Sequence, residues 1–316
     1  MIVAITGGTG FIGQKLVARL IEDGNVVRLL TRRSPAFAAS GSLEVHECDL
    51  LAAQPDELAK ILDGVEVLYH CAGQLKDANV MRALHVDATR KLAEAASGRI
   101  RHWVQLSSVG VYGSLKVGIV TEESALNPIG EYEVTKAESD GIVADAASNG
   151  GFGYSILRPS NVFGTEMANQ SLFAMISMIH RDLFFFIGNP GASANYIHVD
   201  NVVDALVLCG EKTEADGQLY NLSDHRTMEQ FIAVIAESLA RPIPSLRVPE
   251  WSIRLPARLL GGIPGFPLTE LRVDALIGRA IYSTTKIEHE LGYWHIVSME
   301  AGLKELVSSW QQRTGT

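Results

Sequence analysis

The sequence predicts an α/β fold, a doubly wound parallel sheet joined to a smaller and less regular C-terminal lobe. Two observations carry this prediction. Short apolar runs alternate with amphipathic helical patterns through the first half of the chain, as in successive β-α-β units. The first apolar run also ends in a glycine-rich turn, which places that strand in the centre of such a sheet.

The expected strands are apolar enough for a sheet that helices cover on both faces, as in Trp103-Val104-Gln105-Leu106. These strands lie near residues 2–6, 26–31, 43–48, 66–70, 101–107 and 153–158. The expected helices lie near residues 11–23, 55–63, 78–97 and 131–149. After about residue 160 the alternation fades, and six prolines between Pro242 and Pro267 indicate loops between shorter helices.

Residues 1–160 are therefore expected to form a Rossmann-type dinucleotide-binding domain, with residues 161–194 and 225–316 forming most of a substrate lobe. Residues 196–199 have the pattern of a strand and precede a helix that runs from Asp200 to Cys209. We expect this stretch, residues 195–224, to return to the main sheet. No linker separates the two parts, so a ligand is expected between them, beyond the carboxyl ends of the strands.

Composition excludes several classes of protein. The 316 residues are 47% apolar and 20% charged, and the longest apolar run is far too short to cross a membrane. The net charge of −9 argues against a nucleic-acid partner, which would need a basic face. Met1 leads straight into the first strand with no room for a signal peptide, so the cytoplasm is the expected compartment. The three cysteines are expected to be buried, unreactive thiols, and no metal site is predicted.

The glycine-rich turn predicts a site for a dinucleotide pyrophosphate. Gly7, Gly10 and Gly13 follow the first strand, and Phe11 and Ile12 begin the next helix. Glycines let the backbone NH groups approach the phosphates, and the positive end of the helix points at their charge. The spacing differs by one residue from the more general GxGxxG form.

A tyrosine and a lysine four residues apart, Tyr132 and Lys136, share one face of a predicted helix. A nearby ammonium group favours the phenolate, so such a tyrosine can exchange a proton with an alcohol or a carbonyl oxygen during hydride transfer. The spacing alone often arises by chance. Ser107 and Ser108, however, lie where an apolar strand ends, at the edge that faces a ligand in this architecture.

Taken together, these motifs resemble the extended short-chain dehydrogenase/reductases, in the broad family of NAD-dependent epimerases and dehydratases that act on nucleotide sugars. The resemblance covers nearly the whole chain. The residues that carry it are TGGTGFIG at 6–13, Cys48-Asp49-Leu50, His70-Cys71-Ala72-Gly73, SSVGVYG at 107–113, Tyr132 with Lys136, LRPSNVFG at 157–164, YIHVDNVV at 196–203, and STTK with ELGY at 283–293.

The resemblance implies a role for each matching residue. Tyr132 would be the general acid/base, Lys136 would bind the nicotinamide ribose and lower the pKa of Tyr132, and Ser108 rather than Ser107 would hold the reacting oxygen. The other implied contacts are Asp49 and Leu50 at the adenine, Ala72 and Gly73 along the middle of the cofactor, Pro159 at the nicotinamide and Asn161 at the substrate. Relatives of this kind also imply a homodimer, paired through the helix of Tyr132 and its neighbour.

The end of the second expected strand bears on the choice of cofactor. An acidic residue there would bind the adenosine ribose of NAD, whereas a cation accommodates the extra phosphate of NADP. The chain has Arg32 and Arg33 and no carboxylate at this point, and Arg32 matches a phosphate-binding arginine of NADPH-dependent reductases. We therefore favour NADP. The alternative is that both arginines are solvated loop charges and that NAD binds.

Three departures from the family pattern limit the choice of reaction. No acidic pair follows Ser108, which disfavours dehydration, and Ala194 stands where many UDP-sugar epimerases have an arginine for the diphosphate. That cation could come instead from Arg181, Arg272 or Arg279. His85 replaces an asparagine on the helix after the fourth strand, which puts the bridge usually made there in doubt.

The favoured function is hydride transfer at a carbonyl or secondary alcohol of a nucleotide sugar, by a 4-keto reductase or an epimerase. An alternative, encouraged by residues 196–201 and 268–270, is a dehydrogenase of steroid-like or other apolar alcohols. Two or more cations in the substrate pocket would favour the first, and an uncharged aromatic pocket the second. The triplet Phe184-Phe185-Phe186 either lines such a pocket or belongs to the core. A third hypothesis is a redox sensor that binds dinucleotide without turnover.

Overall fold

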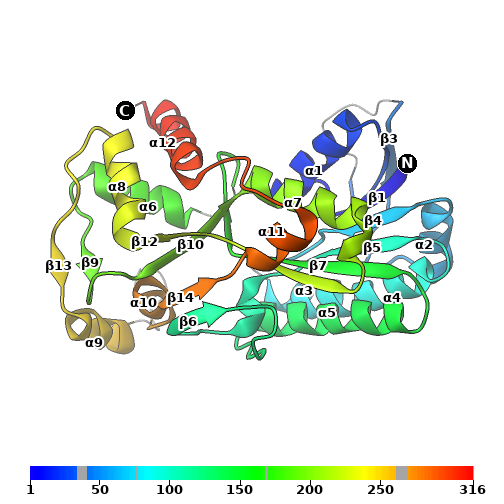
Figure 1. Cartoon of the computed structure of the whole chain (residues 1–316), viewed down its shortest axis with the longest axis horizontal. Coiled ribbons are helices and arrows are strands. Elements are labelled where there is room, and N and C mark those ends of the chain that lie inside the picture. The colour runs from blue at the N-terminus through cyan, green and yellow to red at the C-terminus, as the bar shows by residue number, and fades with distance from the viewer. Residues whose placement is uncertain (34–40, 76, 168–169, 261–269, 316) are drawn as a thin grey trace.

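The computed structural model describes residues 1–33, 41–75, 77–167, 170–260 and 270–315 (Figure 1). Its main sheet is parallel and seven-stranded, in the order β11-β7-β5-β4-β1-β2-β3. This order confirms the predicted doubly wound sheet with the glycine-turn strand in its interior. The strands are β1 (Ile2–Thr6), β2 (Val26–Thr31), β3 (Leu43–Glu47), β4 (Val67–His70), β5 (His102–Leu106), β7 (Gly153–Pro159) and β11 (Gln218–Leu222).

Helices cover both faces of this sheet. One face packs against α1 (Phe11–Glu22) and α7 (Val199–Glu211), and the other against α2 (Pro55–Leu62), α4 (Ala88–Ala96) and α5 (Glu131–Ser148) (Figure 1). Each layer has its own apolar core, so the strands are buried on both sides as their composition predicts. Salt bridges from Lys15 to Asp200 and from Arg19 to Asp204 join α1 to α7.

The expected single helix over residues 78–97 consists of three pieces. They are α3 (Ala78–Arg82), a π-helical segment (Ala83–Asp87) and α4. The π segment contains His85, whose side chain is buried and makes two hydrogen bonds. Segments of this kind widen a helix by one residue and often occur at functional sites. The amphipathic pattern did not reveal the widening because the helical period continues on either side of it.

The prediction for residues 196–199 was wrong in one respect. They belong to β10 (Ser193–His198), which pairs with β8 (Asn161–Phe163) and β12 (Asp224–Thr227) in a separate three-stranded sheet. The main sheet is rejoined only by β11, although α7 does pack on that sheet. Apolar composition alone indicates a strand but not the sheet to which it belongs.

The rest of the second lobe is small sheets and helices around a third apolar core (Figure 1). Two further strand pairs, β14-β6 and β13-β9, lie in it or at its border. The remaining elements are β6 (Val117–Val120), α6 (Ser171–His180), β9 (Phe186–Ile187), α8 (Met228–Ser238), β13 (Arg247–Val248), α9 (Glu250–Leu260), α10 (Glu270–Ile277), β14 (Arg279–Tyr282), α11 (Thr285–Leu291) and α12 (Met299–Thr314), with short 3-10 turns at Val109–Tyr112 and Thr213–Ala215. Within the described residues no helix is both long and apolar enough to span a membrane.

Candidate active site

The glycine turn is closely packed and leaves no room for side chains. Gly7 has a φ of +72°, and a Cβ there would lie 2.6 Å from the backbone of Cys71 and Ala72. A Cβ at Gly13 would lie 2.2 Å from the Gly7 carbonyl oxygen. Gly10 precedes the first turn of α1 and is exposed. The first NH groups of a helix have no partner within it, so this exposed turn fits a dinucleotide pyrophosphate.

The other residues expected at the cofactor follow the carboxyl ends of neighbouring strands. Ala72 and Gly73 follow β4 directly beside Gly7, and Gly73 is exposed. Asp49 lies beyond β3, where its Oδ1 accepts a hydrogen bond from the Leu51 NH and Leu50 is buried. Arg32 is exposed just beyond β2. In the described part of the chain no ion pair or hydrogen bond holds its side chain, so this cation is open to a ligand.

Ser108, Tyr132 and Lys136 come together where β5 ends and α5 begins. The Ser108 side chain hydrogen-bonds to the Tyr132 hydroxyl, and its Oγ also accepts the Gly110 NH at 3.1 Å. Lys136 lies one helical turn beyond Tyr132, is buried, and donates from Nζ to the Leu106 carbonyl oxygen. The hydroxyl, the phenol and the ammonium group thus occupy one edge of the sheet, as the sequence predicts.

The electrostatics differ from the expectation. Burial raises the pKa of Tyr132 to about 12, Ser108 opposes the rise, and Glu133 and Asp140 add to it. Burial also lowers the pKa of Lys136. The expected lowering of the Tyr132 pKa by Lys136 is therefore absent in this structure, because the ammonium group is directed at the Leu106 carbonyl. Tyr132 is held in its protonated form, as a general acid requires.

A buried ion pair supports this edge from below. Asp140 lies one turn beyond Lys136, and its Oδ2 accepts hydrogen bonds from Ser107 Oγ at 2.8 Å and from Arg158 Nη2 at 3.1 Å. Arg158 Nη1 donates to the Tyr112 hydroxyl at 3.0 Å. Ser107 therefore has a structural partner, which leaves Ser108 as the serine available to a substrate.

His85 makes the bridge that the sequence left in doubt. Its Nε2 accepts the Gln74 NH at 2.8 Å, so Nδ1 carries the proton and donates to Thr135 Oγ1, also at 2.8 Å. Burial lowers the pKa of His85 to about 4, which keeps the ring neutral. The ring also meets Tyr132 edge-on, with 5.7 Å between centroids. One side chain thus joins the loop after β4 to the helix of Tyr132.

On the lobe side, Pro159 ends β7 and is buried, while Asn161 begins β8 and is exposed. Asn161 Nδ2 donates to the Asn195 carbonyl oxygen at 3.2 Å. Asn161 is therefore accessible at the border between the two parts of the chain, where a substrate is expected.

The arginines of the lobe are mostly engaged. Arg279 donates to the carbonyl oxygens of Asn189 and Pro190, and Ala194 is buried in the core. Ion pairs also neutralise three other arginines of the lobe: Arg226 pairs with Asp224 and Glu300, Arg247 with Glu229, and Arg254 with Glu250 and Asp274. Arg181 is exposed at the end of α6, and the side chain of Arg272 lies outside the described residues, as do residues 268 and 269.

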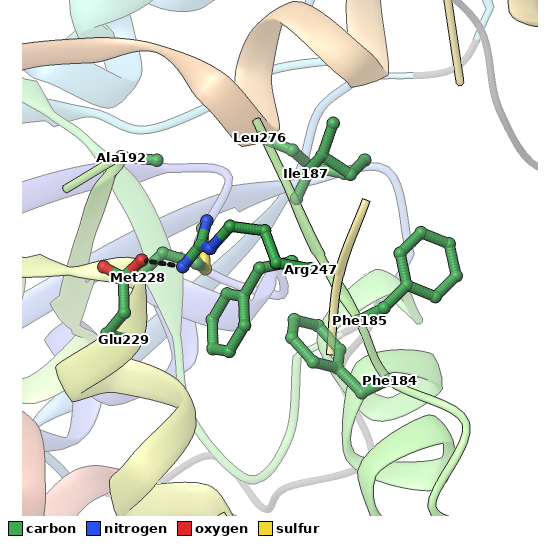
Figure 2. A pocket seen from close by; sticks show the side chains of 9 residues that line it. Phe184, Phe185, Ile187, Ala192, Met228, Glu229, Arg247 and Leu276 are labelled. Atoms are coloured by element: carbon green, nitrogen blue, oxygen red, sulfur yellow. Dashed lines mark hydrogen bonds and ion pairs between the residues drawn. The ribbon is translucent and has the colours of Figure 1, made fainter. Parts of the chain in front are cut away.

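The Phe184-Phe185-Phe186 triplet is divided between core and cavity. All three rings line a cavity of about 30 Å³ with Ile187, Ala192, Met228 and Leu276, and Arg247 and Glu229 form its polar wall (Figure 2). Figure 2 shows the Arg247 guanidinium turned toward the Glu229 carboxylate, at 2.6 Å. A cavity of this volume holds about one water, so it is not a complete substrate pocket. Its lining is nevertheless aromatic and aliphatic, with a single, neutralised cation.

Three residues of the site were not identified from the sequence. Asp140 could have been found, because it continues the four-residue spacing of Tyr132 and Lys136 along one helix face. Thr135, the partner of His85, carries no comparable signal. Glu133 directly follows Tyr132 and packs against Gly110, a contact that depends on the fold of two distant segments.

Comparison with known proteins agrees with this geometry. The family model described as "NAD dependent epimerase/dehydratase family" matches residues 3–223. A 4-hydroxy-2-methyl-3-oxo-4-farnesyl-3,4-dihydroquinoline-1-oxide ketoreductase from Stigmatella aurantiaca is 26% identical, over 96% of this chain and 94% of its own. A dTDP-6-deoxy-L-talose 4-dehydrogenase (NAD(P)(+)) from Kitasatospora kifunensis is 33% identical, over 55% of this chain and 57% of its own.

Among solved structures, the UDP-glucose 4-epimerase of Thermotoga maritima with UDP-glucose superposes with a TM-score of 0.77. The alignment covers 99% of this chain and all of the other, at 22% identity. At that identity the likeness establishes the fold, and the substrate has to be argued from this chain's own residues.

Proposed function

The chain belongs to the NAD dependent epimerase/dehydratase family, and from that premise we propose that it transfers a hydride at a ketone or secondary alcohol. It is an NAD(P)-dependent enzyme of the extended short-chain dehydrogenase/reductase type. One observation supports this reaction above the others: the Tyr132 hydroxyl, the Ser108 side chain and the Lys136 helix face lie together at the sheet edge that carries the glycine turn.

In this reaction Ser108 and Tyr132 bind the substrate oxygen between them. When a ketone is reduced, negative charge develops on its oxygen. Tyr132 donates its proton to that oxygen, and Ser108 stabilises the charge by a hydrogen bond. The dinucleotide supplies the hydride when it is bound. Lys136 would hold its ribose, and Pro159 would border the nicotinamide. At neutral pH the raised pKa keeps Tyr132 protonated, which is the form that reduction requires.

The dinucleotide would lie along the strand ends, on the residues predicted for it. Gly7, Gly10 and Gly13 give the pyrophosphate a backbone cradle, with Phe11 and Ile12 in the first helical turn. We propose NADP rather than NAD, because Arg32 is exposed beyond β2 and no described residue pairs with it. A phosphate on the adenosine ribose would give this guanidinium a partner.

For the substrate we propose an apolar ketone or alcohol in preference to a nucleotide sugar. The described arginines of the lobe are mostly paired with carboxylates or carbonyls, as at Arg247, Arg254 and Arg279. A diphosphate would have to displace those ion pairs. The similarity to the ketoreductase of a farnesylated quinoline points to the same class of substrate.

A nucleotide sugar is the second candidate. The similarity to the dTDP-6-deoxy-L-talose 4-dehydrogenase favours it, as does the exposed side chain of Asn161 at the lobe border. Thermal unfolding distinguishes the two candidates, because a ligand that binds only the native state raises the melting temperature. With NADPH present, UDP- and dTDP-sugars should give no protection if the substrate is apolar, and farnesylated or steroidal ketones should protect.

The reaction itself is tested with Tyr132→Phe, which removes the proton donor and keeps the ring. We expect the rate of turnover to fall by about 10²–10⁴, the usual contribution of a positioned acid/base, while dinucleotide binding is retained. An unchanged rate would exclude Tyr132 as the acid. A bound dinucleotide with no turnover of any ketone, alcohol or nucleotide sugar would favour the redox sensor instead.

We also propose a homodimer in the cytoplasm. The pairing surface would be the outer sides of α5 and of its neighbours α3 and α4, where Arg82 of α3 and Glu138 of α5 form an exposed ion pair. Light scattering after size exclusion tests this, since Glu138→Arg would place two like charges together and leave a monomer.

A further inference from the structure

The side chain of Glu133 lies over two glycines at the edge of the active site. A Cβ on Gly110 would lie 2.9 Å from Glu133 Cγ, and a Cβ on Gly130 would lie 2.3 Å from Glu133 Oε2. Gly110 belongs to the turn that follows Ser108, and Gly130 precedes the first residue of α5. The Glu133 side chain can therefore occupy this position only because neither glycine has a side chain.

The Ser108 side chain lies close to the same glycine, Gly110. Its Oγ would be 3.3 Å from the Cβ of a residue at 110, and it accepts the Gly110 NH at 3.1 Å. Glu133 also acts on Tyr132, because its negative charge helps to raise the pKa of that phenol. A carboxylate thus lies next to both groups that would bind the reacting oxygen.

This carboxylate has no partner within the described part of the chain, in contrast with the other acids of α5 that lie near it. Glu131 forms an ion pair with Arg82 at 3.6 Å, and Glu138 pairs with the same arginine at 2.7 Å. Glu133 is only half-buried, so water or a ligand can reach its oxygens. The geometry therefore offers an unused hydrogen-bond acceptor beside Ser108.

We infer that Glu133 is a specificity-determining residue that accepts a hydrogen bond from a hydroxyl on the carbon next to the reacting one. This inference rests on the proposed function and deepens it. The substrate class becomes an α-hydroxy ketone in reduction, or a vicinal diol in oxidation. The same negative charge excludes substrates that carry a carboxylate at that carbon, because two like charges in a partly desolvated site repel each other.

A purely structural role would give a different result. Glu133 is the third residue of α5, where a carboxylate favours the positive end of the helix whatever the substrate is. Glu131, the first residue of the same helix, also places a carboxylate in the first turn but pairs with Arg82 and not with the region of Gly110. Glu131→Gln is therefore the matched control for loss of a charge at this helix end.

The experiment measures kcat/KM for oxidation of three probe alcohols with NADP: cyclohexanol, trans-1,2-cyclohexanediol and 2-hydroxycyclohexane-1-carboxylate. Thermal protection by the same probes gives binding without turnover. The variants are Glu133→Met, which removes acceptor and charge, Glu133→Gln, which removes the charge alone, and Glu131→Gln. The wild-type enzyme should prefer the diol to cyclohexanol by about tenfold to a hundredfold, the usual effect of a hydrogen bond to a charged group.

Glu133→Met should lose this preference, and both Glu133 variants should gain activity or binding with the carboxylate probe. Glu131→Gln should keep the wild-type pattern. The inference is overturned if the wild-type enzyme shows no preference for the diol in turnover or binding, or if Glu133→Met keeps it. Failure of the proposed function would appear separately, as oxidation of cyclohexanol that survives Tyr132→Phe.

Discussion

The buried pair of Asp140 and Arg158 should be the most sensitive stabilising contact near the active site. Both residues are almost fully enclosed, with 4% and 3% of their surfaces exposed. Asp140 Oδ2 accepts hydrogen bonds from Ser107 and from Arg158 Nε and Nη2, at 2.8, 3.2 and 3.1 Å. Burial raises the pKa of Asp140, and the neighbouring Arg158 is the main influence that opposes the rise.

Asp140→Asn keeps the shape of the side chain and removes its charge, leaving the Arg158 guanidinium buried without compensation. Breaking one side of a buried pair costs about 3–5 kcal/mol, whereas most surface changes cost about 0.5 kcal/mol or less. For a chain of this size that loss lowers the melting temperature by about 5–10 °C. Urea unfolding followed by far-UV circular dichroism gives the free energy, and a thermal scan gives the midpoint.

Asp145→Asn is the control, because Asp145 is exposed on the same helix and its side chain makes no hydrogen bond or ion pair with the described residues. The double variant Asp140→Leu with Arg158→Met should recover part of the lost stability, since an apolar pair of similar volume leaves no buried charge. A loss below about 1 kcal/mol in Asp140→Asn, or equal losses in Asp140→Asn and Asp145→Asn, would refute the assignment of a tightly coupled pair.

Three further outcomes are expected. Gly13→Ala should abolish dinucleotide binding, measured by quenching of protein fluorescence, because its Cβ would lie 2.2 Å from a carbonyl oxygen of the turn; normal binding would contradict the cradle. Arg32→Ala should weaken the binding of NADPH at least tenfold and leave the binding of NADH unchanged. An equal effect on both affinities would show that Arg32 does not bind the extra phosphate. The buried rings of His70, His85 and His102 have pKa values lowered to about 3, 4 and 4, so stability is present above pH 6.5 and is lost as pH falls toward 4. Protonation of each histidine should lower the free energy of unfolding by about 2 kcal/mol between pH 7 and 5. In urea titrations His102→Gln should reduce the pH dependence of that free energy by the same amount, and an unchanged pH dependence would contradict a contribution from His102.

Local pattern and topology account for the part of the site that the sequence predicted. Gly7 and Gly13 lie in one short turn, and Tyr132 and Lys136 lie one helical turn apart, so neither relation depends on distant packing. Parallel strands end at the same edge, which is why the sequence alone places Ser108 beside them. These relations are short in sequence or follow from sheet topology, and both are visible in a single chain.

The remaining features depend on contacts between distant segments. The strand at Tyr196 is apolar, and this composition would suit pairing with Leu157 of the main sheet as well as with Asn161 of the small sheet. In the structure Tyr196 pairs with Asn161. Burial raises the pKa of Tyr132, and Lys136 does not offset the rise because its Nζ donates to the Leu106 carbonyl oxygen. Side-chain direction of this kind has no periodic signature in the sequence.

His85 shows how a departure from a family pattern becomes intelligible only in three dimensions. His85 lies in the π segment, and from there its ring reaches both the loop at Gln74 and the helix at Thr135. The neutral ring then has one acceptor and one donor nitrogen, and it uses both. An asparagine has fewer atoms with which to span the same gap. The histidine is thus suited to a direct bridge.

Helix α5 is consequently held at three points that bear on the reaction. His85 holds its second turn through Thr135, Lys136 holds the same turn through the Leu106 carbonyl, and Arg158 holds the following turn through Asp140. These anchors come from three different elements, a π segment and strands β5 and β7. Tyr132 and Glu133 lie in the first turn of the helix, so a displacement of the helix would also displace these two side chains relative to the reacting oxygen. Rigid anchoring beneath two adjacent groups, one giving a proton and one accepting a hydrogen bond, is what a site that distinguishes neighbouring carbons of a substrate requires.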